Sequence, residues 1–178
     1  MEAAIKEKKS VSDKADAIIW AAVTVNAGLG AVPFGINNWT FIGVNTAMVV
    51  WLGTTYGHHL TDKGASAIIK QIFSAVGMTT MCLYYGAKFF AEVLKGVGLF
   101  TMGGPTLIGM ALDAVLCGAM TYALGYTAKE YFERNQSLSQ QQMNEVFMKR
   151  FEQGKTAVRA MKEQQQQQPP ASTVKPAA

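Results

Sequence analysis

The sequence predicts an all-α protein, with a membrane-embedded bundle of about four helices in two hairpins and an amphipathic C-terminal helix. Residues 17–61 contain no Asp, Glu, Lys or Arg. Only seven of the 28 charged residues, 16 basic and 12 acidic, fall between residues 17 and 128. A soluble domain of this size rarely hides so long an uncharged stretch from water. In lipid, only helices and closed barrels satisfy their own backbone hydrogen bonds, so we expect helices in lipid.

Charge and composition divide the chain into four parts. Residues 1–16 form a polar N-terminal segment, 17–134 the helical membrane domain, 138–163 an amphipathic helix, and 164–178 a low-complexity tail rich in Gln and Pro. No small-residue cleavage site follows the polar start, so we expect the first hydrophobic segment to remain in the protein.

The first hairpin is expected over residues 17–61, with a turn around Pro33. Its first helix should start near Asp13 or Asp16, because acidic residues favour a helix N-terminus, and end at the proline. The second helix should end near Gly57. Each arm is close to the roughly 20 residues that a bilayer-spanning helix needs.

The second hairpin joins two longer helices. Thr61 or Asp62 is suited to cap the first of them, whose roughly 30 residues would be about 45 Å long and exceed one bilayer core. A connection rich in Gly over residues 96–106 leads to the second helix. The uncharged hairpin tips leave open whether the hairpins span the bilayer or re-enter it. The mean hydropathy of only +0.12 also leaves open a soluble helical bundle.

Asp113 is the one charged residue between positions 96 and 128. A carboxylate inside a membrane is costly unless it is paired, protonated or in contact with water, so we expect it to face the bundle interior. Two roles stay open, a proton or ion relay and a buried carboxyl hydrogen-bonded to a neighbouring helix. The second is favoured because a relay normally needs several ionisable groups.

Two pairs of small residues are candidates for close helix packing. They are Gly53 with Gly57 and Ala114 with Gly118. Small residues four positions apart let helices approach closely in lipid.

The sequence contains no convincing motif for catalysis or ligand binding. Residues 154–156, Gly-Lys-Thr, resemble the end of a phosphate-binding loop, but Lys149 stands where that motif requires Gly. The adjacent His58 and His59 would point about 100° apart on a helix, unlike the i, i+4 pair that a metal site favours. We therefore expect no enzyme activity, no metal and no cofactor.

The C-terminal helix is expected to follow a Ser139 cap and to carry one apolar stripe. Its members are Met143, Phe147, Phe151, Val158 and Met161. Gly154 should interrupt this helix at a cost of about 1 kcal/mol. An apolar stripe left alone in water usually has a binding partner, and the small excess of basic residues is weak for a lipid site. We expect the helix to bind another protein or its own symmetry mate, and no nucleic acid.

Three stretches of the chain resemble a known family. They read GLGAVPFGINNWTFIGVNTAMVVWLGTTYG, TDKGASAIIKQI and VGLFTMGGPTLIGMALDAVLCGAMTYALGYTAKEYFER. Over residues 17–134 the chain is similar to the YcjF-related, GTPase-associated membrane domain of unknown function. The resemblance implies a membrane anchor or adaptor. These residues carry no GTPase domain, so a nucleotide-linked role would need a separate P-loop GTPase as partner.

Together these patterns predict a non-enzymatic integral membrane adaptor or scaffold. A helical membrane pore or transporter and a soluble helical bundle are the alternatives. The expected location is the bacterial inner membrane or a related internal membrane. Both termini should lie in the cytoplasm, because basic residues flank the hydrophobic region on both sides.

Overall fold

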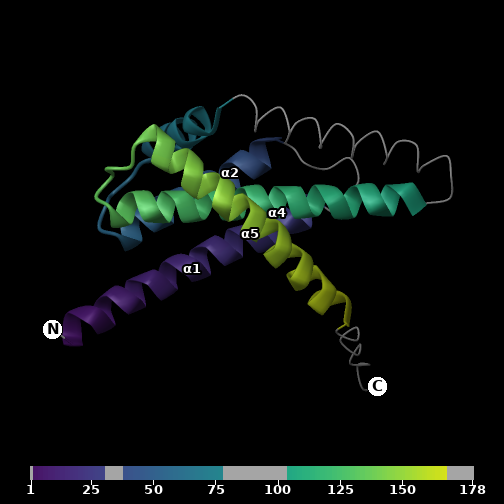
Figure 1. Ribbon diagram of the computed structural model, residues 1–178, viewed down its shortest axis with the longest axis horizontal. Helices are drawn as coiled ribbons and strands as arrows, with labels where there is room; N and C mark the ends of the chain where they lie inside the picture. Colours follow the sequence, from purple (N-terminus) through teal and green to yellow (C-terminus); the bar gives the residue numbers. More distant parts are fainter. Residues whose placement is uncertain (1, 31–37, 78–103, 168–178) are drawn as a thin grey trace, which may run out of the picture.

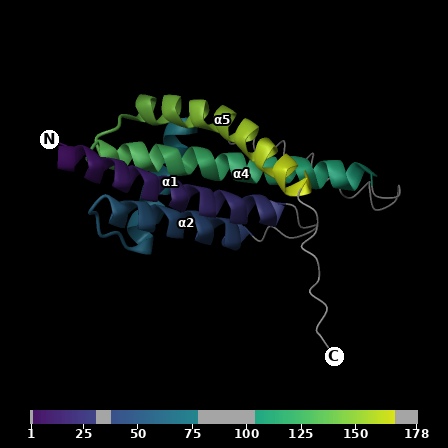
Figure 2. The same ribbon diagram turned by 90° about the horizontal axis from the view of Figure 1, so that it is seen from below.

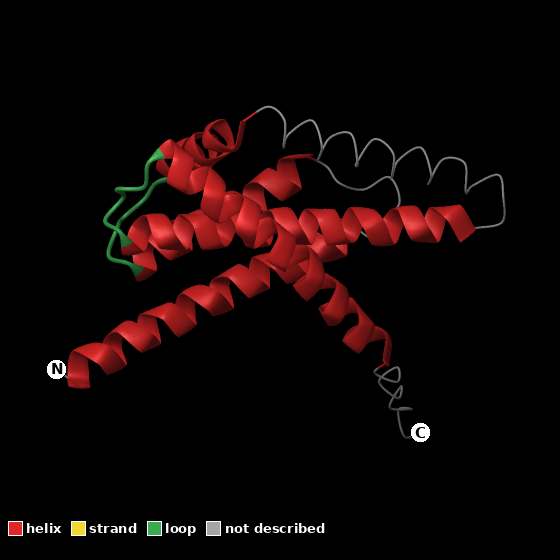
Figure 3. Ribbon diagram, in the orientation of Figure 1, coloured by secondary structure: helices red, strands yellow, loops and turns green. Residues whose placement is uncertain are grey.

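The computed structural model describes residues 2–30, 38–77 and 104–167, and every regular element in these ranges is a helix (Figure 3). The elements are α1 (Glu2–Gly30), α2 (Asn38–Thr55), a helix over residues 62–77, α4 (Gly104–Glu133) and α5 (Gln140–Gln167). The all-α prediction is therefore confirmed for the described part of the chain.

The central element is α4, which packs against α1, α2 and α5, while α1 also packs against α2 (Figure 1). Figure 2 shows α5 and α2 on opposite sides of α4, with α1 between α4 and α2. The helix over residues 62–77 contacts α5, because the rings of Phe73 and Phe147 meet edge to face at 6.1 Å. The first predicted hairpin corresponds to α1 and α2. The expected second hairpin is described at the helix over residues 62–77 and at α4, whereas its residues 78–103 lie outside the described residues.

The first helix begins earlier than predicted. We expected residues 1–16 to be a separate polar segment, whereas α1 begins at Glu2 and continues without interruption to Gly30. The physical reason is helix propensity, since this start is rich in Ala, Glu and Lys and contains neither Gly nor Pro. Its N-terminal half projects from the rest of the bundle (Figure 1).

Both α2 and α4 end in the same left-handed termination. After α2, Gly57 has a φ of 82°, and the amide of His58 donates to the carbonyl of Gly53 at 2.8 Å. After α4, Asn135 has a φ of 50°, and the amide of Gln136 donates to Tyr131 at 2.8 Å. This pattern satisfies carbonyls at the helix end that would otherwise lack partners.

The two capping predictions are confirmed. Thr61 Oγ1 accepts a hydrogen bond from the amide of Gly64 at 3.3 Å, which caps the helix over residues 62–77. Ser139 Oγ accepts from the amide of Gln142 at 3.2 Å, and Gln142 Oε1 accepts from the amide of Ser139 at 2.9 Å. This reciprocal arrangement is a capping box and fixes the start of α5.

One apolar core joins all the described helices. Its largest fully buried side chains include Ile19, Leu52, Ile72, Leu124 and Phe147. Within the described ranges, no helix combines the length and the apolar character that a bilayer crossing requires.

Candidate functional site

The outer surface of α1 and α2 carries exposed apolar side chains. Trp51 is 63% exposed and Val25 49%. Ile18 and Val44 border a shallow groove between the two helices, which Val25 and Trp51 also line. We name this surface, defined by Ile18, Val25, Val44 and Trp51, the α1–α2 face. The groove in this face is lined by apolar residues alone, so covering it and removing it from water is favourable.

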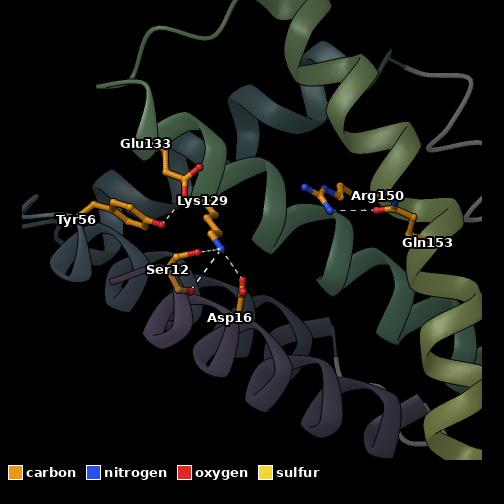
Figure 4. Close-up of polar contacts among 7 residues, drawn as sticks. All are labelled: Ser12, Asp16, Tyr56, Lys129, Glu133, Arg150 and Gln153. Atoms are coloured by element: carbon orange, nitrogen blue, oxygen red, sulfur yellow. Dashed lines mark hydrogen bonds and ion pairs between the residues drawn. The ribbon is translucent and has the colours of Figure 1, made fainter. Parts of the chain in front are cut away.

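The charged side chains near α1 gather beyond one end of that face. Lys129 of α4 is 8% exposed, and its ammonium donates to Asp16 Oδ1 at 2.6 Å and to Ser12 Oγ at 2.9 Å (Figure 4). Burying an ammonium is costly unless it is paired and hydrogen-bonded, and these contacts meet both conditions. The cluster ties α1 to α4.

The turn after α2 is fixed to the end of α4. The hydroxyl of Tyr56 donates to Glu133 at 2.8 Å (Figure 4). The ring of Tyr56 stacks on that of Phe132 with centroids 6.4 Å apart. Burial, together with the hydrogen bond to Glu133, raises the pKa of Tyr56 above its ordinary value. The ring nitrogen Nδ1 of His58 lies 3.2 Å from the side-chain nitrogen Nε2 of Gln136, so this histidine also contacts the residues that follow α4.

A row of aromatic rings with one arginine follows the seam between α1, α4 and α5. Trp20 meets Tyr122 edge to face at 5.5 Å, and Tyr122 lies 4.5 Å from Tyr126. The guanidinium of Arg150 lies 4.7 Å above the ring of Tyr126, and its Nη1 donates to Gln153 at 3.1 Å. All four of the ring and guanidinium side chains are half-buried. Sequence reasoning missed this row, although the i, i+4 spacing of the two tyrosines could have marked it.

The apolar stripe predicted on α5 is covered by the chain itself. Met143, Phe147 and Val158 are fully buried, and Phe151 and Met161 pack against the same core. The expectation of an uncovered stripe was therefore wrong, and with it the separation of α5 from the bundle. The partner of the stripe lies within the chain, mainly on α4. The sequence predicted that the stripe would be buried against another surface, but it did not indicate that this surface is α4.

Gly154 also has a different role from the predicted one. The helix runs through it without a break. A Cβ added there would lie 3.0 Å from the Cα of Ala119 and 3.1 Å from the Cβ of Tyr122. The glycine thus lets the backbone of α5 approach α4 closely, which compensates for its poor helix propensity.

The small-residue pairs divide into two kinds. Ala114 is fully buried on α4, and a Cβ on Gly118 would lie 2.9 Å from Val158 of α5 and 3.2 Å from Ala27 of α1. Among the described residues, no helix packs against Gly53 or Gly57. Gly53 makes room for the side chain of Leu60, and Gly57 terminates α2 with open space around it. The interpretation of Gly53 and Gly57 as a helix-packing pair was wrong for the described helices.

Asp113 lies on α4, but its side chain falls outside the described part of the structure. Two asparagines are buried among the described helices. Asn26 donates to Thr121 Oγ1 at 2.8 Å, and Asn45 donates to the carbonyl of Phe41 at 2.9 Å. The side-chain oxygens of both asparagines have no hydrogen-bond partner. No three potential metal ligands cluster anywhere in the described ranges.

A family model described as a domain of unknown function, DUF697, matches residues 2–156. The match includes the projecting start of α1 and the half of α5 that crosses α4. No curated protein and no solved structure matches the chain.

Proposed function

We propose that this chain, which belongs to the DUF697 family of domains of unknown function, is a non-enzymatic membrane adaptor. The observation that carries the proposal is the α1–α2 face. Trp51 and Val25 are large apolar side chains that are about half exposed or more and line one groove, and α2 contains no charged residue. A contiguous apolar surface of this kind marks a site for a membrane or a protein.

Lipid is favoured by how charge is distributed along the bundle. The first 16 residues of α1 contain four Lys and several acidic residues, whereas the rest of the helix contains none of either. Lys129 and Glu133 lie at the same end as Asp16 and Tyr56. A helix that is uncharged in one half and charged in the other fits the boundary between lipid and water.

The adaptor role follows from the opposite side of the molecule. The helix α5, which lies across α4 from α2 in Figure 2, carries five Lys or Arg and three Glu between residues 139 and 163. With the α1–α2 face on a bilayer, this polar side would face the cytoplasm. Binding to a separate P-loop GTPase, at the bacterial inner membrane or a related internal membrane, agrees with the resemblance to GTPase-associated domains.

The proposal is tested by flotation of the purified chain with vesicles of phosphatidylcholine and phosphatidylglycerol. The wild-type chain should float with the vesicles. Trp51→Glu combined with Val25→Glu should lower the bound fraction at least about fivefold, because each carboxylate would have to leave water. The matched control is Thr156→Glu, an exposed position on α5.

Three outcomes separate the alternatives. A floated chain that resists carbonate extraction has a helix pair inserted in lipid, whereas one that carbonate removes is bound at the surface. A wild-type chain that stays in the aqueous fraction at every lipid concentration would support the soluble helical bundle instead. Equal flotation of the double variant and the control would place the lipid contact elsewhere on the molecule.

A further inference from the structure

We infer that Arg150, presented by the ring of Tyr126, binds a carboxylate side chain of a partner protein. We name this site, defined by Trp20, Tyr122, Tyr126, Arg150 and Gln153, the tyrosine–arginine seam. The inference deepens the proposed function, because it names the chemistry by which the adaptor would hold its protein partner.

The first argument is composition. Trp, Tyr and Arg are the residue types that most often carry the energy of protein interfaces. Here the rings of Trp20, Tyr122 and Tyr126 follow one another at 5.5 and 4.5 Å and end at the guanidinium of Arg150. All four side chains are half-buried, so each has one side packed in the fold and retains some exposed surface.

The second argument is charge. Near the same ring lie two cations, since the ammonium of Lys129 is 5.6 Å from Tyr126 and the guanidinium of Arg150 is 4.7 Å from it. Lys129 is neutralised by Asp16 at 2.6 Å. Among the described residues, no carboxylate lies within ion-pair distance of Arg150, whose hydrogen bond goes to the neutral Gln153 (Figure 4). The seam therefore holds one positive charge in excess, which one carboxylate would balance.

The third argument is that the arginine is held in place. One turn after Arg150, Gly154 brings the backbone of α5 against Ala119, so this part of α5 lies directly on α4. On the buried side of α5, Phe147 and Phe151 stack with centroids 6.3 Å apart and join the core. A guanidinium fixed over a ring loses little conformational entropy when it binds. Its planar fork also matches the two oxygens of a carboxylate.

The test uses the purified full chain and two acetylated, amidated ten-residue peptides. One alternates Glu with Ser, and the other alternates Gln with Ser. Binding is followed by NMR at the side-chain Nε–H of Arg150 and at the tyrosine rings. We expect the Glu peptide to shift these signals and the Gln peptide to leave them unchanged.

The variants separate a specific site from a general attraction to a basic helix. Arg150→Gln should weaken binding of the Glu peptide about tenfold, whereas Arg159→Gln, at an exposed position on the same helix, should weaken it no more than about twofold. Arg150→Lys keeps the charge and the position over the ring but loses the planar fork, so it should weaken binding about threefold or more. This second variant keeps the test decisive if Arg150→Gln loosens α5.

Several results would overturn the inference. Equal losses in Arg150→Gln and Arg159→Gln would show an unspecific charge effect, and binding of the Gln peptide would remove the role of the carboxylate. Tighter binding of inorganic phosphate than of the Glu peptide would make the seam a phosphate site. Flotation with vesicles reports on the proposed membrane role separately, because Arg150→Gln should float as the wild-type chain does.

Discussion

Asp16 and Lys129 form the ion pair in which the cation is most buried among the described residues. The Lys129 side chain is 10% exposed and that of Asp16 is 38%. Asp16→Asn should lower the free energy of unfolding by about 1–3 kcal/mol, because it leaves a buried ammonium without its counter-charge. The matched control is Glu130→Gln, which breaks the more exposed i, i+4 pair with Arg134 and should cost about 0.5 kcal/mol or less. Urea denaturation measures both, and equal losses would contradict this role of burial.

Tyr56 predicts how stability changes at high pH. Burial and the hydrogen bond to Glu133 raise its pKa above the ordinary value of about 10. The folded state therefore favours the neutral phenol. The stability that Tyr56 contributes is complete below about pH 10 and is lost as the pH rises further, because the unfolded chain then ionises first.

Tyr56→Phe removes this titration. Its urea midpoint should be lower than that of the wild-type chain at neutral pH, since one hydrogen bond worth about 1 kcal/mol is lost. The difference between the two proteins should then shrink as the pH increases from about 9 to 11. A difference that stays constant over this range would show that the phenol ionises equally in both states.

At the scale of helices, Gly154 and Gly43 make opposite predictions for the same substitution. Gly154→Ala would place a Cβ 3.0 Å from backbone atoms of α4 that cannot easily move. The cost of overpacking, about 1–3 kcal/mol, should exceed the gain in helix propensity of about 1 kcal/mol. A Cβ added at Gly43 on α2 would meet no atom within 4 Å. Gly43→Ala should therefore raise the free energy of unfolding by up to about 1 kcal/mol. Thermal unfolding distinguishes them, and a stabilised Gly154→Ala would mean that α4 and α5 can separate.

The sequence predicted the helices better than it predicted what each helix covers. The Ser139 cap and the spacing of the stripe from Met143 to Met161 are local signals, and both lead to α5. Which surface covers the stripe depends on contacts with α4, which no local signal contains. The early start of α1 was missed for a different reason, because its charges were interpreted as a boundary although Glu, Lys and Ala all favour helix.

For the whole molecule, the burial of the stripe predicts that α5 unfolds together with the rest of the bundle. Phe147→Asp would place a carboxylate among fully buried side chains and should cost about 3–5 kcal/mol or more, as the loss of a buried Phe alone does. Thr156→Asp on the exposed side of α5 should change stability by less than about 0.5 kcal/mol. Limited proteolysis within α5 and thermal unfolding are the measurements. A Phe147→Asp chain with wild-type stability would show that α5 is a detachable arm.

The candidate sites were predictable only in part, because they are assembled from distant segments. The apolar character of α2 is visible in the sequence, but the exposure of Trp51 depends on which side of α2 is turned towards α1 and α4. The tyrosine–arginine seam joins Trp20, Tyr126 and Arg150 from three helices. Single-sequence patterns report neighbours along one helix, so they miss such combinations.

The central position of α4 has a consequence for biosynthesis. The contacts that fix α1 are distant in sequence, since Asn26 and Thr121 are 95 positions apart and Asp16 and Lys129 are 113 apart. At roughly 5–20 residues per second, a nascent α1 waits about 5–20 s before the ribosome has added the residues of α4 that bind it. Ile19 and Val23, buried in the finished protein, lack the cover that α4 gives for that time. A chaperone or a membrane insertion factor would therefore meet the growing chain at α1, before α4 exists.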